Sequence, residues 1–477
     1  MPATAHASPF FRRLPKLPNW PALVGILLIC LILFQAIQSW CRVEWMQIPS
    51  LIIMVAMVPY LILHGSKVGK VFVILSIIIA LVAFFRLSNA PEVLAAALLR
   101  AAFFQAFLTA VFTLQEAANR STDINRVGLY LISQPLRKQS ILTLLGTNLM
   151  ALMMNMGSLV IIGALARDRM KNDETRGTGT TERGWMTAVA AIRGFSPSAT
   201  WSPLALPPVF LSSLYLDLSL GHTMQVGFAI SVIILTVSCL FTYLEASLIL
   251  RRGGVPYVDA VPFPGHSILK ILLLLTGIFT SIYFIAHGLD ISTSAAAFVI
   301  IPVTSCLWIL LGRGYNISGL INGPMKNMVF LQLPTQAAGT SVIVSAAFLG
   351  PVLVELLPMD QIAQAVLNMH LSAFTLMALV FITIMGLAMI GLSPVLTTTL
   401  AIAVIGDPSN FGLSPITIVA ILLTAWALAA QFSPYTGTAT IASRMFEVSV
   451  ERLVLVRNGP FMVLTLILVL FGIFCMT

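Results

Sequence analysis

The sequence predicts an all-α polytopic membrane protein, because of its composition and its series of apolar segments. Of its 477 residues, 58% are hydrophobic and only 9% are charged, and the mean hydropathy is +0.98. Soluble domains carry about 25% charged residues, so this composition excludes an ordinary soluble fold. No polar stretch is long enough for a separate soluble domain. The five cysteines share no metal or redox spacing, and we interpret them as packing residues.

Thirteen apolar segments approach or exceed the length of about 20 residues that a membrane span needs. The first lacks a small-residue cleavage site, so we expect a retained helix rather than a signal peptide. In chain order the segments cover residues 22–40, 48–64, 69–86, 92–115, 140–166, 185–213, 225–249, 268–287, 293–312, 328–356, 373–406, 414–446 and 460–476.

Two of these segments contain a break that marks the predicted functional centre. The first lies in the stretch from Arg193 to Pro203, where Pro197 and Pro203 disfavour an undisturbed helix. The second lies near residue 433, and the triplet Phe-Ser-Pro occurs in both, 237 residues apart. Interrupted helices at matching positions in two halves are typical of a carrier's binding site. The alternative is a pair of proline kinks in ordinary membrane helices.

The segments 140–166 and 373–406 are predicted to be re-entrant hairpins. The first is rich in glycine and asparagine, and the second is too long for one span and is interrupted at Gly391–Pro394. If both segments are hairpins, 22 of the 26 lysine and arginine residues lie on the cytoplasmic side and two lie outside. If both segments cross the membrane fully, 12 lie on each side. The positive-inside rule therefore favours eleven spans, a cytoplasmic N-terminus and an external C-terminus.

This topology divides the chain into two units of opposite orientation. Residues 1–47 form an N-terminal segment and leading helix, 48–250 the first unit, 251–267 a linker and 268–477 the second unit. Each unit has three spans, a hairpin, a broken helix and a last span. We expect an inverted-topology repeat, which is the architecture of many alternating-access carriers.

The plan resembles the ion-transporter superfamily, which includes divalent-anion/sodium symporters, arsenite and sodium/proton antiporters, and the membrane subunit of TRAP carriers. In the symporters each hairpin tip carries Ser-Asn-Thr, and substrate and sodium bind between the tips and the unwound helices. This chain lacks that triplet. The resemblance implies a homodimer, and a site that includes, at the two tips, Asn155, Gly157, Ser158, Ser393 and Thr397.

Small oxygen-bearing side chains at both breaks suit ion and solute binding. Their oxygens and the freed backbone carbonyls are hard ligands for sodium, while free N–H groups at half-helix starts attract anions. The alternative for any single hydroxyl is a bond to its own helix backbone. The predicted ligands at the breaks are Ser196, Ser198, Thr200 and Ser202 in the first unit and Ser433, Thr436, Thr438 and Thr440 in the second.

Arg193 is the one charge beside a break, and the guanidinium fork would suit a carboxylate or oxyanion. The alternative is that the aliphatic stem of Arg193 lies along the helix and its guanidinium reaches the cytoplasmic surface. We expect Glu245, Glu355 and His370 at the membrane edge, and no role is predicted for Arg100.

The predicted function is secondary active transport of a small anionic solute, a carboxylate or oxyanion, by alternating access. No carboxylate lies at a tip or a break, which favours sodium over protons as the coupling ion. The alternative is a cation/proton antiporter or exporter of the same fold.

An intramembrane enzyme is disfavoured, because the six histidines are isolated and no nucleophile-base pair is present. We expect no cofactor beyond sodium, no nucleic-acid partner, and a place in the bacterial inner membrane.

Overall fold

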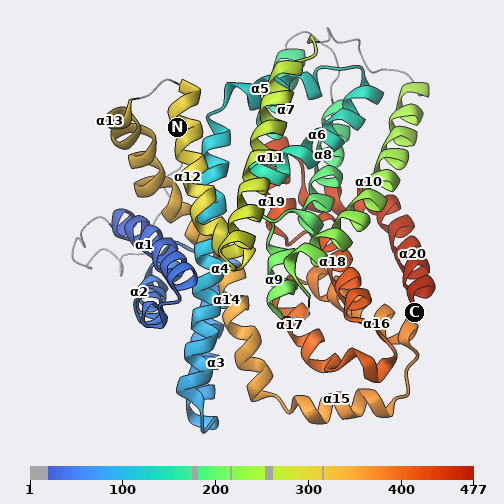
Figure 1. Ribbon diagram of the computed structural model, residues 1–477. Coiled ribbons are helices and arrows are strands. Elements are labelled where there is room, and N and C mark those ends of the chain that lie inside the picture. Colours follow the sequence, from blue (N-terminus) through green and yellow to red (C-terminus); the bar gives the residue numbers. More distant parts are fainter. Residues whose placement is uncertain (1–19, 175–180, 215–217, 253–260, 314–315) are drawn as a thin grey trace, which may run out of the picture.

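The computed structural model describes residues 20–174, 181–214, 218–252, 261–313 and 316–477, and every regular element in these ranges is a helix (Figure 1). Ten of the described helical stretches are long and apolar enough to cross a membrane. The predicted fold class, an all-α polytopic membrane protein, is therefore confirmed.

The single-span segments form helices close to their predicted bounds. Helix α14 continues a helical run, formed by α13 (Ile317–Leu320), η3 (Ile321–Met325) and η4 (Met328–Gln332), that begins eleven residues before the predicted start at 328. The remaining single spans and their connector are α1 (Trp20–Cys41), η2 (Glu44–Met46), α2 (Gln47–His64), α3 (Lys67–Arg86), α4 (Ala90–Asn119), α10 (Leu220–Arg251), α11 (Gly265–Gly288), α12 (Thr293–Arg313), α14 (Leu333–Leu356) and α20 (Gly459–Met476).

Each predicted hairpin is a pair of helices that pack against each other. Helices α6 (Leu136–Met154) and α7 (Gly157–Glu174) are joined by a turn in which Asn155 has a φ of +48°. Helices α16 (Ala373–Met389) and α17 (Pro394–Ile405) are joined by a turn in which Gly391 has a φ of +98°. Asparagine and glycine are the residues that most readily adopt positive φ, which explains why the chain reverses there.

Both predicted broken helices are present. Helix α8 (Thr181–Trp201) is followed by α9 (Leu206–Leu214), and α18 (Pro415–Phe432) by α19 (Gly437–Phe446). The prediction that Pro197 interrupts the first of them is wrong, because α8 runs through it and ends at Trp201. Proline is tolerated inside membrane helices where neighbouring groups satisfy the freed backbone carbonyl.

Two short amphipathic helices were not predicted. In each half, one connects the third span to the hairpin: α5 (Thr122–Ile132) in the first half and α15 (Met359–Asn368) in the second. Figure 1 shows α5 at one end of the bundle and α15 lying across the opposite end. The short turns η5 (Pro408–Phe411) and η6 (Arg452–Arg457) complete the described elements.

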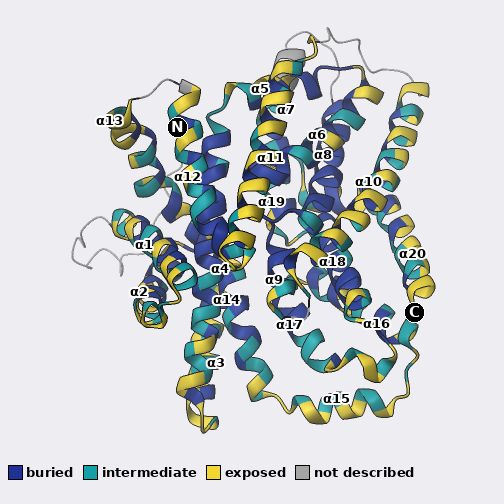
Figure 2. Ribbon diagram, viewed as in Figure 1, coloured by how far each residue is buried: buried dark blue, intermediate teal, exposed yellow. Residues whose placement is uncertain are grey.

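The broken helices lie inside the bundle and the outer spans surround them. Helix α8 packs against α6, α10 and α18, while α4 packs against α14 and α12. Most of α18 is buried, whereas only about a fifth of the residues in α3, α10 and α20 are buried (Figure 2). Helices α8 and α18, which precede the two breaks, are thus largely held away from the surface by the remaining helices.

The turn at Gly391 provides a test of the second hairpin. Gly391→Ala is expected to lower the free energy of unfolding by about 1–2 kcal/mol, because a side chain disfavours positive φ. The matched control is Gly386→Ala in α16, where an added methyl group meets no atom within 4 Å. Melting temperatures in detergent should fall for Gly391→Ala only; equal values for both variants would contradict this turn.

Candidate functional site

The first break spans the four residues after Trp201, and Ser202 organises it. The Ser202 hydroxyl donates to the carbonyl of Leu152 in α6 at 3.4 Å and accepts from the backbone N–H of Leu204 at 3.2 Å. One side chain thus caps the turn and connects it to the first hairpin. Residues 202–205 are all buried.

The second break has the same construction at Ser433. The Ser433 hydroxyl donates to the carbonyl of Ala388 in α16 at 2.7 Å and accepts from the backbone N–H of Tyr435 at 3.2 Å. Both breaks thus contain a Ser-Pro dipeptide, Ser202-Pro203 and Ser433-Pro434, and the two dipeptides are 231 residues apart. The first Phe-Ser-Pro triplet lies inside α8, so the offset of 237 residues between the two triplets does not relate the two breaks.

Both hairpin turns lie against the second break. A methyl group added at Gly437, the first residue of α19, would lie 3.3 Å from the Met156 side chain in the first hairpin turn. One added at Gly391 would lie 3.6 Å from the ring of Tyr435. Tyr435 is 64% exposed and Gly437 is also exposed, in contrast to the buried first break.

The predicted ligands at the hairpin turns bond to their own turns. The Ser158 hydroxyl donates to the Asn155 carbonyl at 2.8 Å, and Gly157 lies against the side chain of Gln115 in α4. In the second hairpin, the Ser393 hydroxyl accepts from the N–H of Val395 at 3.3 Å, and Thr397 donates within the first turn of α17. These hydroxyls keep oxygen lone pairs for a further partner.

The predicted ligands in α8 are buried and lie before the break rather than in it. Ser196 donates to the carbonyl of Ala427 in α18 at 2.6 Å, so it joins the two broken helices. Ser198 donates to Phe195, and Thr200 makes bonds to the carbonyls of Pro197 and Gly227.

In the second unit, the Thr436 hydroxyl caps α19 by accepting from the N–H of Ala439 at 3.3 Å, and Thr438 is buried in the first turn of that helix. The structure therefore brings Thr436 and Thr438 to the exposed break and leaves the three α8 hydroxyls within the helix packing.

Gln431 is a candidate site residue that was not predicted. It is fully buried in the last turn of α18, two residues before Ser433, and neither its amide oxygen nor its amide nitrogen has a partner in the described chain. The hydroxyl of Thr398 in α17 is also buried without a partner. Buried polar groups in native proteins are nearly always paired, so these atoms call for a ligand or water. The signal in the sequence is a single glutamine within the apolar run of α18.

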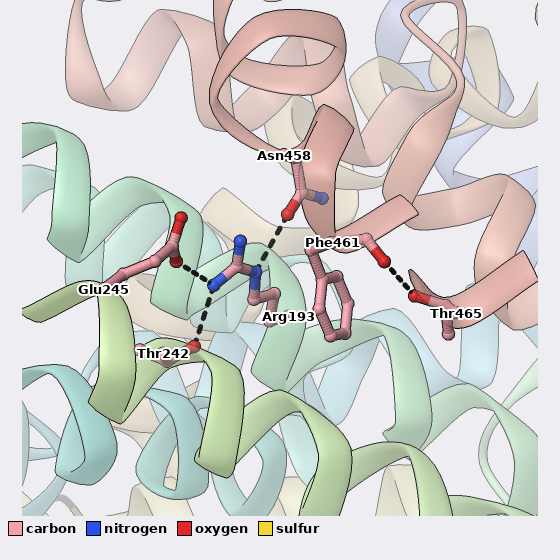
Figure 3. Close-up of polar contacts among 6 residues, drawn as sticks. All are labelled: Arg193, Thr242, Glu245, Asn458, Phe461 and Thr465. Atoms are coloured by element: carbon pink, nitrogen blue, oxygen red, sulfur yellow. Dashed lines mark hydrogen bonds and ion pairs between the residues drawn. The ribbon is translucent and has the colours of Figure 1, made fainter. Parts of the chain in front are cut away.

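Arg193 is fully buried and is held by polar groups of two other helical elements (Figure 3). Nη1 donates to Glu245 at 2.5 Å and to Thr242 at 2.9 Å, both in α10, and Nε donates to Asn458 at 2.8 Å, just before α20. The guanidinium also lies over the rings of Phe241 and Phe461, at 5.0 and 4.5 Å from their centroids. Only Nη2 lacks an acceptor in the described residues.

These contacts change the interpretation of Arg193 and Glu245. Arg193 does not extend to the surface, and its charge is balanced by Glu245 rather than being free for a solute. It lies nine residues before Ser202, about 13 Å along the helix, which separates it from the first break. Binding of a solute by Arg193 stays a prediction. Of its guanidinium nitrogens, Nη2 is the one without an acceptor among the described residues, so it is the one that could donate to a solute.

The other charges left open by the sequence lie outside the breaks. Arg100 donates to Ser213 at 3.4 Å and lies over the ring of Phe210, so it packs against α9. Glu355 and His370 are exposed. In the part of the chain that the structure describes, no group of three or more histidine, cysteine or acidic residues is arranged to hold a metal ion.

Comparison with known proteins gives one similar structure by name. No family model and no curated protein matches the chain. Among solved structures, the YdaH transporter of Alcanivorax borkumensis is similar, with 16% identity and a TM-score of 0.48 over 77% of this chain and 82% of that one.

The ion pair of Arg193 leads to a stability prediction. Arg193→Met should lower the free energy of unfolding by about 3–5 kcal/mol, because it leaves Glu245 without its partner. Arg193→Met combined with Glu245→Gln should recover most of the loss. Thermal unfolding in detergent tests both, with Arg100→Met as the control for removing a charge from a helix. If Arg193→Met unfolds at the wild-type temperature, the pair does not hold α8 in place.

Proposed function

We propose that the chain is a secondary active transporter, and the repeated use of Ser202 and Ser433 is the observation that supports it most. Each serine makes the same two hydrogen bonds, one to its own turn and one to the first helix of the preceding hairpin. Chance interruptions of ordinary helices would not share this construction. Paired broken helices with adjoining hairpins are typical of carriers that bind solute at the middle of the membrane.

The inverted-repeat organisation is part of this proposal. Equivalent elements occur in the same order in both halves, and the connecting helices α5 and α15 lie at opposite ends of the bundle (Figure 1). Helix α17 has 12 residues, about 18 Å, which is too short to cross a hydrocarbon core of about 30 Å. This length supports a re-entrant arrangement for the second hairpin.

We place the solute at the second break, between the two hairpin turns. The starts of α7 and α19 lie side by side there, at Met156 and Gly437, and two helix N-termini together favour a negative charge. Gln431 supplies an amide that can donate to a carboxylate or oxyanion and offers an oxygen to sodium. The proposed cargo is therefore a small anion, with sodium as the coupling ion.

The difference between the two breaks supports alternating access. Tyr435 and Gly437 are accessible at the second break, whereas residues 202–205 are closed in by packing. A carrier observed in one of its two states is expected to have one side of its site open and the other sealed. If the open side then closed and the sealed side opened, the solute would be carried across the membrane.

The function is tested by thermal unfolding of the purified protein in sodium or choline, each with succinate, citrate, glutamate, sulfate or phosphate. A ligand that binds only the folded state stabilises by about 2.7 kcal/mol at one hundred times its Kd. We expect one anion to raise the melting temperature in sodium and not in choline. Stabilisation by no anion under either cation would contradict a sodium-coupled anion carrier and favour the antiporter or exporter.

Gln431→Ala locates the site. We expect the variant to lose the stabilisation by that anion, while its melting temperature without ligand stays equal or rises, because an unpaired buried amide has been removed. The control is Gln38→Ala in α1, where another buried amide oxygen lacks a partner far from both breaks in the sequence. Equal ligand responses in the two variants would move the site away from Gln431.

A further inference from the structure

A π-helical turn, η6, brings two arginines over one aromatic ring. The segment Arg452–Arg457 reads Arg-Leu-Val-Leu-Val-Arg, and residues five apart in an α-helix point about 140° away from each other. The wider π turn, with its i→i+5 hydrogen bonds, brings such residues towards the same side. Arg452 and Arg457 lie over the ring of Trp185 in α8, at 5.2 and 5.5 Å from its centroid.

The Trp185 ring that the two arginines share lies one helical turn from Glu182, and the charge of Arg252 also acts on the Glu182 carboxylate. Arg457 forms a two-pronged ion pair with Glu182, in the first turn of α8, through bonds of 2.9 and 2.6 Å. That bond, together with the charges of Arg457, Arg452 and Arg252, lowers the pKa of the Glu182 carboxyl below its usual value. One carboxylate balances one arginine, so the cluster keeps an excess of positive charge.

The elements that carry the other two arginines also expose apolar side chains. Arg252 follows the end of α10, and both Arg252 and Arg452 are exposed. On the same elements, Leu455 and Val456 in η6 are 40% and 65% exposed, and Leu248 in α10 is 53% exposed. An exposed positive charge next to exposed apolar side chains matches the boundary between phospholipid headgroups and acyl chains.

We propose that Arg252, Arg452 and Arg457, between the start of α8, the end of α10 and η6, bind the phosphate of an anionic phospholipid. Guanidinium groups bind phosphate oxygens through paired hydrogen bonds, and Glu182 satisfies only one of these three, that of Arg457. Leu248, Leu455 and Val456 would contact the acyl chains, which selects a lipid over a free phosphate ion. The site is separate from the two breaks and does not depend on the proposed solute.

The test measures lipid binding to delipidated protein by native mass spectrometry and by thermal unfolding. The probes are phosphatidylglycerol, phosphatidylcholine and inorganic phosphate. We expect phosphatidylglycerol to bind and stabilise the wild type, and the double variant Arg252→Gln/Arg452→Gln to bind it about thirtyfold more weakly. Arg457 is left intact, because its bonds to Glu182 join η6 to α8.

The matched control is Arg251→Gln/Arg444→Gln, which removes the same charge from two exposed arginines that do not act on Glu182. This variant should bind phosphatidylglycerol as the wild type does, and Arg252→Lys/Arg452→Lys should bind more tightly than the glutamine double variant. Equal loss in the glutamine and control variants would overturn the site. Equal stabilisation by inorganic phosphate and phosphatidylglycerol would overturn the assignment to a lipid.

Discussion

A helix that stops inside a membrane leaves backbone groups that need partners from the protein or from a water-lined cavity, and this requirement shapes the centre of the bundle. The chain meets it twice with the same dipeptide, Ser-Pro. In each case proline prevents the helix from continuing, and the serine hydroxyl serves both the amide two residues on and a carbonyl of the hairpin. Each break is therefore tied to a hairpin by the hydroxyl that also caps its turn.

The second constraint is the buried charge of Arg193. A guanidinium without water needs acceptors, and the chain supplies them from α10 and from the residue that precedes α20. Helix α8 is thereby joined to α10 and, through Asn458, to the start of α20. The interaction with Ser196, which bonds to the backbone of α18, adds a direct link between the two broken helices. These contacts cross from one half of the chain to the other, which keeps the two breaks in a defined relation.

The re-entrant arrangement of the two helix pairs stays a prediction, whereas the spans, the pairs themselves and the existence of two broken helices were predictable from apolar segment length and from glycine and proline content. The position of the first break was not, because Pro197 and Pro203 each follow a serine and only packing decides which one ends the helix. The partners of Arg193 lie 52 and 265 residues further on, beyond any local pattern. The significance of Gln431 depends on what is missing around it, and that is a property of the folded chain.

Solute accumulation in proteoliposomes distinguishes coupled transport from passive flow, using the anion that stabilises the purified protein. With an inward sodium gradient, we expect the anion to accumulate above its external concentration, and a sodium ionophore to abolish the accumulation. Vesicles with the Gln431→Ala variant should not accumulate the anion. Uptake that stops at equal concentrations on both sides, with and without a sodium gradient, would contradict a coupled carrier and indicate a passive pathway.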